Sequence, residues 1–254
     1  YKDGTFLTDA QFRNDYSMTS SGGTVNYTAT LSQNGSTVYT SPALTHYQYE
    51  VWRRVFHTNG APTSDTHNIQ RDITYYVKAG AVPNYDLALG ITDSSIGSVA
   101  STNITPLSNT GYMSDMGTTG DRDDIGPMPN WHAKWLRTQN AAAAKHALAM
   151  ANGAGSFPWH HYDPTTKDYI SLDKYPTLWI DDGNRGDVDL AQPIRDTKWR
   201  VETAHPPAAT MIPYVFTGDR YFLDGVNAQA AAVVFMLWPY PRQNGKGIAM
   251  DGAD

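Results

Sequence analysis

The sequence predicts an α+β protein in which a strand-rich region precedes a helical region. Ser and Thr together number 32 in residues 1–120 and 10 in residues 121–254, whereas Ala rises from 8 to 19. Hydroxylated and β-branched residues favour strands and turns, and alanine is the strongest helix former. We therefore expect a β-rich region over 1–119 and an α-helical region over 120–254.

The first region contains a clear hairpin signal. Segments 24–31 and 36–39 flank the pair Asn34-Gly35. An Asn-Gly pair between two strand-like runs is typical of a tight β-hairpin turn. We expect two antiparallel strands to meet at this turn.

A longer strand is predicted over residues 47–57. Side chains alternate between the two faces of a strand, and here both faces carry large apolar residues such as Val51 and Trp52. The strand is therefore expected to lie between two layers or beside the helical region. Segment 68–79 fits either a further strand or a short helix, and the Ser, Thr, Asn and Gly of 92–119 indicate a long loop.

The second region contains two helical stretches of similar layout. Helix-forming residues run over about 131–150, and the pair at 139–140 can divide them into two helices. The second stretch begins at 205–207, pauses at the Thr-Gly-Asp of 217–219 and resumes over 220–238. Each stretch thus predicts a helical hairpin with a short polar turn, and a long aromatic loop separates the two.

Charge and motifs exclude several classes of protein. Lys and Arg number 19 and Asp and Glu 25, so the formal charge is −6, and no basic run is present. We therefore expect neither nucleic acid nor an anionic membrane as a partner, and no apolar stretch approaches the roughly 20 residues of a membrane span. Cys is absent, which excludes disulfides, thiolate metal sites and Cys nucleophiles. The motifs of serine esterases, zincins, nucleotide hydrolases and Rossmann dehydrogenases are also absent.

The composition favours a carbohydrate ligand. Aromatic residues make up 12% of the chain and charged residues only 17%. Sugar rings stack on flat aromatic faces, and their hydroxyl groups need neutral polar partners. A loop-rich secreted or particle-borne protein without a sugar ligand remains an alternative. Because the chain starts at Tyr1, we interpret it as a mature form or a piece of a longer protein, located extracellularly or on a particle.

The segment HPPAATMIPYVFTGDRYFLDGVNAQAAAVVF at 205–235 is similar to the hairpin repeat of bacterial (α/α)-toroid glycan-active proteins, and 120–140 resembles the preceding hairpin. The order of the two regions also resembles the exo-acting rhamnogalacturonan-lyase-like polysaccharide lyases and uncharacterised bacterial and phage-associated proteins. The resemblance implies a β-sandwich-like region followed by a partial (α/α) toroid. Such toroids carry more hairpins than the two found here, so an additional chain or further residues are expected to complete the ring.

A lyase that acts on an acidic polysaccharide by β-elimination needs a base for the proton at C5. It also needs a cationic or amide group that neutralises the uronate carboxylate. The candidates for the catalytic set are three histidines, a tyrosine and two arginines: His160, His161, His205, Tyr214, Arg200 and Arg122. The candidates for substrate binding are aromatic, amide and basic residues expected along one cleft: Trp131, Asn130, His132, Trp159, Tyr162, Trp179 and Arg54.

Two other functions stay open beside the lyase. A glycoside hydrolase would use two carboxylates that flank the scissile bond, but the sequence alone does not say which acids converge. A non-catalytic glycan-binding or structural subunit of a phage or extracellular assembly would use the histidines only as packed rings. No cofactor or metal is assigned, although the Asp-x-Asp spacings at 121–123 and 187–189 leave calcium open.

Overall fold

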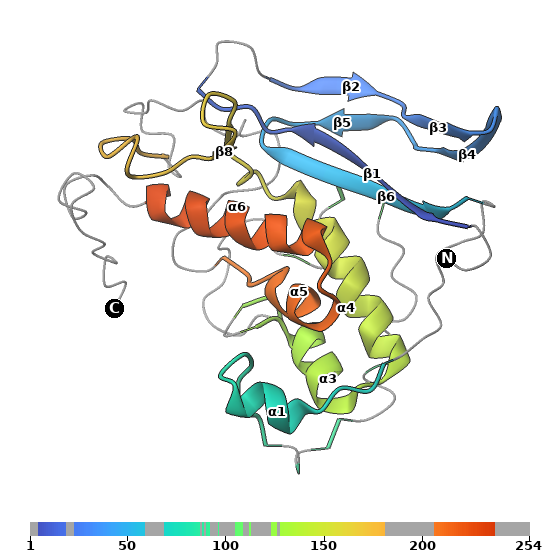
Figure 1. Ribbon diagram of the computed structural model, residues 1–254, viewed down its shortest axis with the longest axis vertical. Coiled ribbons are helices and arrows are strands. Elements are labelled where there is room, and N and C mark those ends of the chain that lie inside the picture. Colours follow the sequence, from blue (N-terminus) through green and yellow to red (C-terminus); the bar gives the residue numbers. More distant parts are fainter. Residues whose placement is uncertain are drawn as a thin grey trace.

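The computed structural model combines antiparallel strand pairs with α-helices, which is the α+β class that the composition predicts. It describes residues 5–18, 23–58, 69–86, 88, 90–91, 96, 105–108, 112, 123–125, 128–180 and 206–236. The strands of the N-terminal region lie together at one end, and the helices extend away from them (Figure 1). Within the described residues, no helix has the length and apolar character needed to cross a bilayer.

Three strand pairs form the N-terminal region. β1 (Leu7–Asn14) runs antiparallel to β6 (Glu50–His57), β2 (Val25–Tyr27) to β5 (Leu44–His46), and β3 (Thr30–Gln33) to β4 (Ser36–Thr40). The predicted hairpin is confirmed, because β3 and β4 meet at Asn34 and Gly35 with φ angles of 50° and 79°. These left-handed values are the ones that an Asn-Gly turn accommodates at low cost.

Strand β6 lies between two layers, as its two apolar faces predict. Val51 packs on the helical side with Ala151 and Phe222. Trp52, on the other face, is 1% exposed and its indole stacks on the ring of Phe12 at 4.2 Å between centroids. The strand therefore joins the strand layer to the helices through side chains on both of its faces.

The helices begin and end where the polar pairs predict. α3 (Asn130–Thr138) ends at Gln139 with φ 51°, and the Asn140 side chain caps α4 (Ala141–Gly153) by accepting from two backbone N–H groups. α5 (Met211–Thr217) ends at Gly218 with φ 68°, and α6 (Arg220–Met236) follows. The ambiguous segment 68–79 contains a short helix, α1 (Ile73–Lys78).

Two strands and a 3₁₀ turn complete the architecture. A 3₁₀ turn (Ala154–Ser156) extends α4. β7 (Tyr162–Asp163) pairs with β8 (Asp168–Tyr169) in a small hairpin within the segment that was predicted as a long aromatic loop. The main core lies among the helices and holds large buried side chains such as Trp135, Leu136, Met150, Ile212 and Phe235. Most of the predicted loop at 92–119 lies outside the described residues.

Candidate functional site

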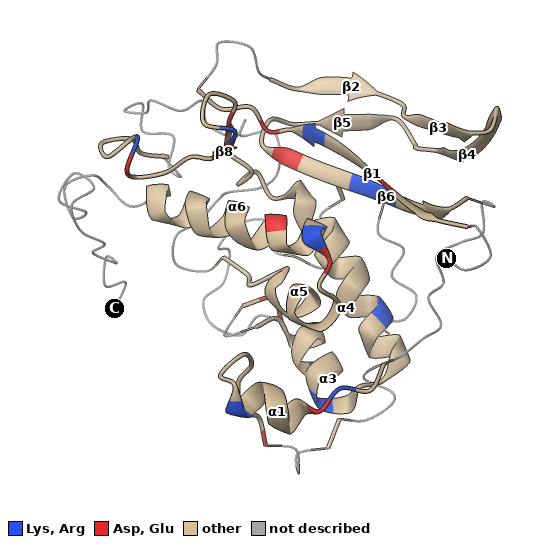
Figure 2. Ribbon diagram, in the orientation of Figure 1, with Lys and Arg blue, Asp and Glu red and all other residues tan. Residues whose placement is uncertain are grey.

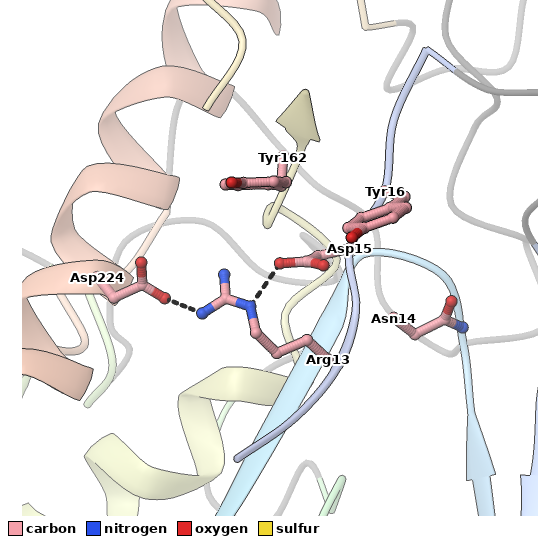
Figure 3. Close-up of a pocket in the computed structure, with 6 residues that line it drawn as sticks. All are labelled: Arg13, Asn14, Asp15, Tyr16, Tyr162 and Asp224. Carbon is pink, nitrogen blue, oxygen red and sulfur yellow. Dashed lines mark hydrogen bonds and ion pairs between the residues drawn. The ribbon is translucent and has the colours of Figure 1, made fainter. Parts of the chain in front are cut away.

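A pocket of about 610 Å³ opens where the strand layer meets the helices. It is lined by the end of β1 and the residues after it, by β7 and by α6: Arg13, Asn14, Asp15, Tyr16, Tyr162 and Asp224 (Figure 3). Its volume lies within the range of small-molecule sites, about 300–1,000 Å³. Figure 2 shows charged residues on β1, β6 and α6 around this junction.

Arg13 occupies the centre of the pocket and bonds in three directions. Its Nε donates to Asp15 Oδ2 at 2.6 Å, its Nη1 to Asp224 Oδ2 at 2.6 Å, and its Nη2 to Tyr169 Oη at 3.0 Å. The planar guanidinium thus holds two carboxylates on two of its sides, as Figure 3 shows. Asp15 is 4% exposed, whereas the side chain of Asp224 is 29% exposed.

The two carboxylates have different surroundings. Burial raises the pKa of Asp15 above its ordinary value, although the neighbouring Arg13 works against that rise. Burial alone would lower the pKa of Arg13, but Tyr169 and the two carboxylates outweigh it and the net pKa is raised. Arg13 therefore stays charged, and the described part of the lining carries two acidic groups for one basic group.

Two tyrosine rings lie beside the charged groups. Tyr16 and Tyr162 have centroids 6.0 Å apart with an angle of 22° between their planes, and Tyr16 is 55% exposed. Tyr162 N donates to Asp15 O at 2.9 Å, and Ser17 N donates to Tyr162 O at 2.8 Å. These backbone bonds hold the two segments that carry the rings side by side, next to the buried carboxylate.

The hairpin that carries Tyr162 is held by a buried carboxylate. Asp163 is fully buried and accepts from Tyr175 Oη at 2.6 Å, from Lys174 Nζ at 3.0 Å and from Thr165 N at 2.8 Å. Burial alone would raise the pKa of Asp163, but these donors outweigh it and hold the pKa well below its usual range. The ionised Asp163 thus positions β7 at the pocket wall.

The predicted histidines lie in the interior and not on the pocket wall. His160 is 2% exposed and His132 and His161 are fully buried. Burial lowers the pKa of His160 to about 4, and the pKa of His132 and His161 to about 3. They are therefore neutral packed rings at pH 7, which corrects the expectation that these histidines line a cleft.

Most of the predicted sugar-stacking residues also belong to the core. Trp131 is 6% exposed and meets the Tyr112 ring edge-on, Trp159 stacks on Phe157, and Trp179 donates to the Met236 carbonyl group. Their indole faces are covered by protein, so they are not available for stacking on a sugar. Of the candidates, Tyr162 alone lines the pocket among the described residues.

The remaining candidates are dispersed. Asn130, at the start of α3, donates to Asp123 at 2.8 Å, and Tyr214 packs against the cluster that contains Val51. Arg54 lies over the Tyr39 ring at 4.4 Å in the strand layer. None of these three lines the pocket. Arg122, Arg200 and His205 lie outside the described residues.

Among the residues that line the pocket, Arg13, Asp15, Tyr16 and Asp224 were not predicted from the sequence. One signal could have found Asp224, because it is the sole acidic residue of α6, a helix that is mostly apolar, and a lone carboxylate there needs a partner. No local sequence pattern distinguishes Arg13, Asp15 or Tyr16. Within the described residues, no group of three or more acidic or histidine side chains is arranged to hold a metal ion. Of the Asp-x-Asp positions considered for calcium, only Asp123 is described.

Comparison with models of protein families gave no match. Comparison with curated proteins and with solved structures gave no significant match. The resemblance to (α/α)-toroid glycan-active proteins therefore stays a prediction from the sequence.

Proposed function

We propose that the protein binds a carbohydrate in the Arg13 pocket. The observation that carries the proposal is the pair of near-parallel rings of Tyr16 and Tyr162 beside a polar floor of Arg13, Asp15 and Asp224. A sugar ring needs one flat aromatic surface and several charged or polar hydrogen-bond partners. Both lie in the same pocket, and the strong aromatic content of the chain agrees with this ligand class.

The charge of the pocket favours a neutral glycan over a uronate. Asp15 and Asp224 already occupy two nitrogens of Arg13, and the lining has an excess of acidic groups. A uronate carboxylate would meet repulsion there. Removal of the C5 proton by the histidines that the sequence analysis favoured has little support, because the described ones are buried. β-Elimination on an acidic polysaccharide stays a prediction.

Hydrolysis of the bound glycan is the second candidate function. Glycosidases use a protonated carboxyl group with a raised pKa together with an ionised carboxylate. Asp15, whose pKa burial raises, and the more exposed Asp224 are the two carboxyl groups that the pocket offers for these roles. The structural-subunit alternative requires neither group.

The finer architecture and the location are part of the same proposal. α3 and α4 pack as one helical pair and α5 and α6 as another, which is the unit from which an (α/α) toroid is built. We propose that these pairs belong to a partial toroid completed by further residues or another chain. The strand pairs would form one side of a β-sandwich-like region, and the protein would act extracellularly or on a particle.

The test is binding of neutral and acidic oligosaccharides to the full chain, measured by titration calorimetry. Tyr16→Ala is expected to weaken binding by about five-fold, since an aromatic stacking contact contributes about 1 kcal/mol. Tyr75→Ala is the matched control, because Tyr75 is 68% exposed but does not line the pocket. Equal effects of the two variants, or no binding to any oligosaccharide, would contradict the proposal.

The same glycans are incubated with the protein to identify the reaction. Hydrolysis predicts that new reducing ends form without a rise in ultraviolet absorbance. It also predicts that no reducing ends form with either Asp15→Asn or Asp224→Asn. A rise in both signals would instead establish a lyase. Binding without either signal would leave a glycan-binding subunit.

A further inference from the structure

A separate cavity of about 310 Å³ lies between α1, the residues that follow it and the end of α3. It shares no lining residue with the Arg13 pocket, and α1 and α3 lie at the end of the molecule remote from the strands (Figure 1). Its volume falls at the lower limit of small-molecule sites, about 300 Å³. The cavity therefore offers room for a small ligand away from the proposed carbohydrate.

The walls of this cavity are largely apolar. Its apolar lining consists of Ile73 and Val77 of α1, Pro83 and Tyr85 of the segment that follows α1, and Leu136 of α3. Ile73, Val77 and Tyr85 are partly buried and pack on the main core, so these walls are supported from behind. Such a surface favours a hydrocarbon or aromatic group.

The charged groups of the cavity are both basic. Lys78 and Arg137 lie in the last turns of α1 and α3 and line the cavity, and none of the described residues that line it is acidic. Neither side chain forms an ion pair with any described residue. Two cations that have no ion-pair partner among the described residues, in a chain of net charge −6, create a local site for an anion.

Arg137 carries a further sign of an absent partner. Its Nε is buried and donates no hydrogen bond within the part of the chain that the structure describes. By contrast, Arg13, Arg53 and Arg71 donate hydrogen bonds to carboxylate, amide, hydroxyl or carbonyl oxygens. A buried donor without an acceptor is costly, and the fork of the guanidinium matches the two oxygens of a carboxylate.

We propose that this cavity binds a small amphipathic monocarboxylate. Its carboxylate accepts hydrogen bonds from Arg137 and Lys78, and its apolar body packs against Ile73, Val77 and Leu136. The site is independent of the proposed carbohydrate function, so either proposal can fail without the other.

The experiment is titration calorimetry of the full chain with octanoate, with 1-octanol as the uncharged counterpart and inorganic phosphate as the anion without an apolar body. Saturable one-site binding of octanoate is expected, with 1-octanol and phosphate at least about ten-fold weaker because each lacks one half of the recognition. Equal binding of 1-octanol would overturn the carboxylate assignment. Equal binding of phosphate would overturn the role assigned to the apolar wall. If octanoate does not bind saturably, the proposed site is wrong.

Three variants locate the site. Arg137→Gln is expected to weaken octanoate binding by about ten-fold or more, since a charge-assisted hydrogen bond is lost. Lys145→Gln removes a cation from an exposed position on α4 and is the matched control. Thr74→Trp fills the mouth of the cavity from an exposed position without altering either cation, and abolition of binding with an unchanged thermal melt is expected. Undiminished binding in Thr74→Trp, or equal effects of Arg137→Gln and Lys145→Gln, would overturn the proposal.

Discussion

Arg13 and Asp224 are separated by 211 residues in the sequence, yet their side chains form an ion pair of 2.6 Å between β1 and α6. The same guanidinium holds Asp15, which is 4% exposed. One side chain of the first strand therefore ties the strand layer to the last described helix and forms the floor of the candidate site. The stability and the chemistry of this junction depend on the same contacts.

Removing Arg13 is expected to cost more stability than removing Asp224. Arg13→Met leaves the buried Asp15 carboxylate without its cation, at a cost of about 1–3 kcal/mol. Asp224→Asn removes a partly exposed ion pair, which contributes roughly 0–1 kcal/mol after solvent screening. Urea denaturation of each variant measures the difference. The control is Asp173→Asn, at an exposed position outside the pocket, and equal losses in Arg13→Met and Asp224→Asn would contradict the argument.

Gly155 should tolerate no side chain. A Cβ at this position would meet the backbone carbonyl group of Val51 and the Tyr221 hydroxyl group. Gly155→Ala therefore forces the 3₁₀ turn Ala154–Ser156 and β6 apart and should destabilise the fold by about 2–3 kcal/mol. Gly90→Ala is the control, because a Cβ there meets no atom within 4 Å. The midpoints of thermal unfolding compare the two, and similar midpoints would refute the close approach.

Glu50 should make the protein lose stability as the pH rises towards 8. Burial raises the pKa of Glu50 from its ordinary 4.5 to about 8, so between these values the folded state binds more protons than the unfolded state. The free energy of unfolding then falls with rising pH, by up to about 1.4 kcal/mol per pH unit for one such group. Glu50→Gln should remove this slope above pH 6.5. An unchanged slope in urea titrations would rule out Glu50 as its source.

The buried histidines should cause the opposite trend at lower pH. The pKa of His160 is lowered by burial from 6.5 to about 4, and that of His132 to about 3. Between about pH 4 and 6.5 the unfolded state therefore binds more protons, so stability is lost as the pH falls through this window. Together with Glu50, these groups predict a stability maximum near neutral pH. His132→Gln should flatten the acid limb, which denaturation between pH 4 and 6.5 measures.

Asp163 should position the hairpin of Tyr162. Asp163→Asn weakens the bonds from Lys174 and Tyr175 to a fully buried group and should cost about 1–3 kcal/mol. Carbohydrate binding is expected to weaken with it, because β7 carries a ring of the pocket. Asp168→Asn on the neighbouring exposed position is the control. Hydrogen exchange of the amides of β7 and β8 reports the local change, and unaltered protection in Asp163→Asn would argue against the positioning role.

Local signals predicted the turns and helix boundaries well. Asn34-Gly35, Gln139-Asn140 and Gly218 each end an element, because their backbone preferences or capping bonds act within one turn of the chain. The two apolar faces of β6 likewise predicted its place between layers. Strand β1 was missed because its exposed and half-buried residues give no apolar signal of their own.

The candidate site was predicted less well than the fold. Histidines and tryptophans were chosen for their chemistry, but residue type does not reveal burial, and His161 and Trp159 proved to be packed in the interior. Tyr162 was found because it lies in an aromatic loop. Asp15 and Arg13 had no distinguishing pattern, since their role arises from a partner on another element.

The sequence by itself determined the α+β class of the fold and the positions of several turns, because propensity and capping are local properties of the chain. The tertiary structure decided which charges meet and which rings are covered. Arg13 becomes a pocket floor only when β1, β7 and α6 pack together, and Arg137 faces its cavity only when α1 lies on α3. Both arrangements depend on contacts between distant segments, whose free energy comes from burial in the assembled core.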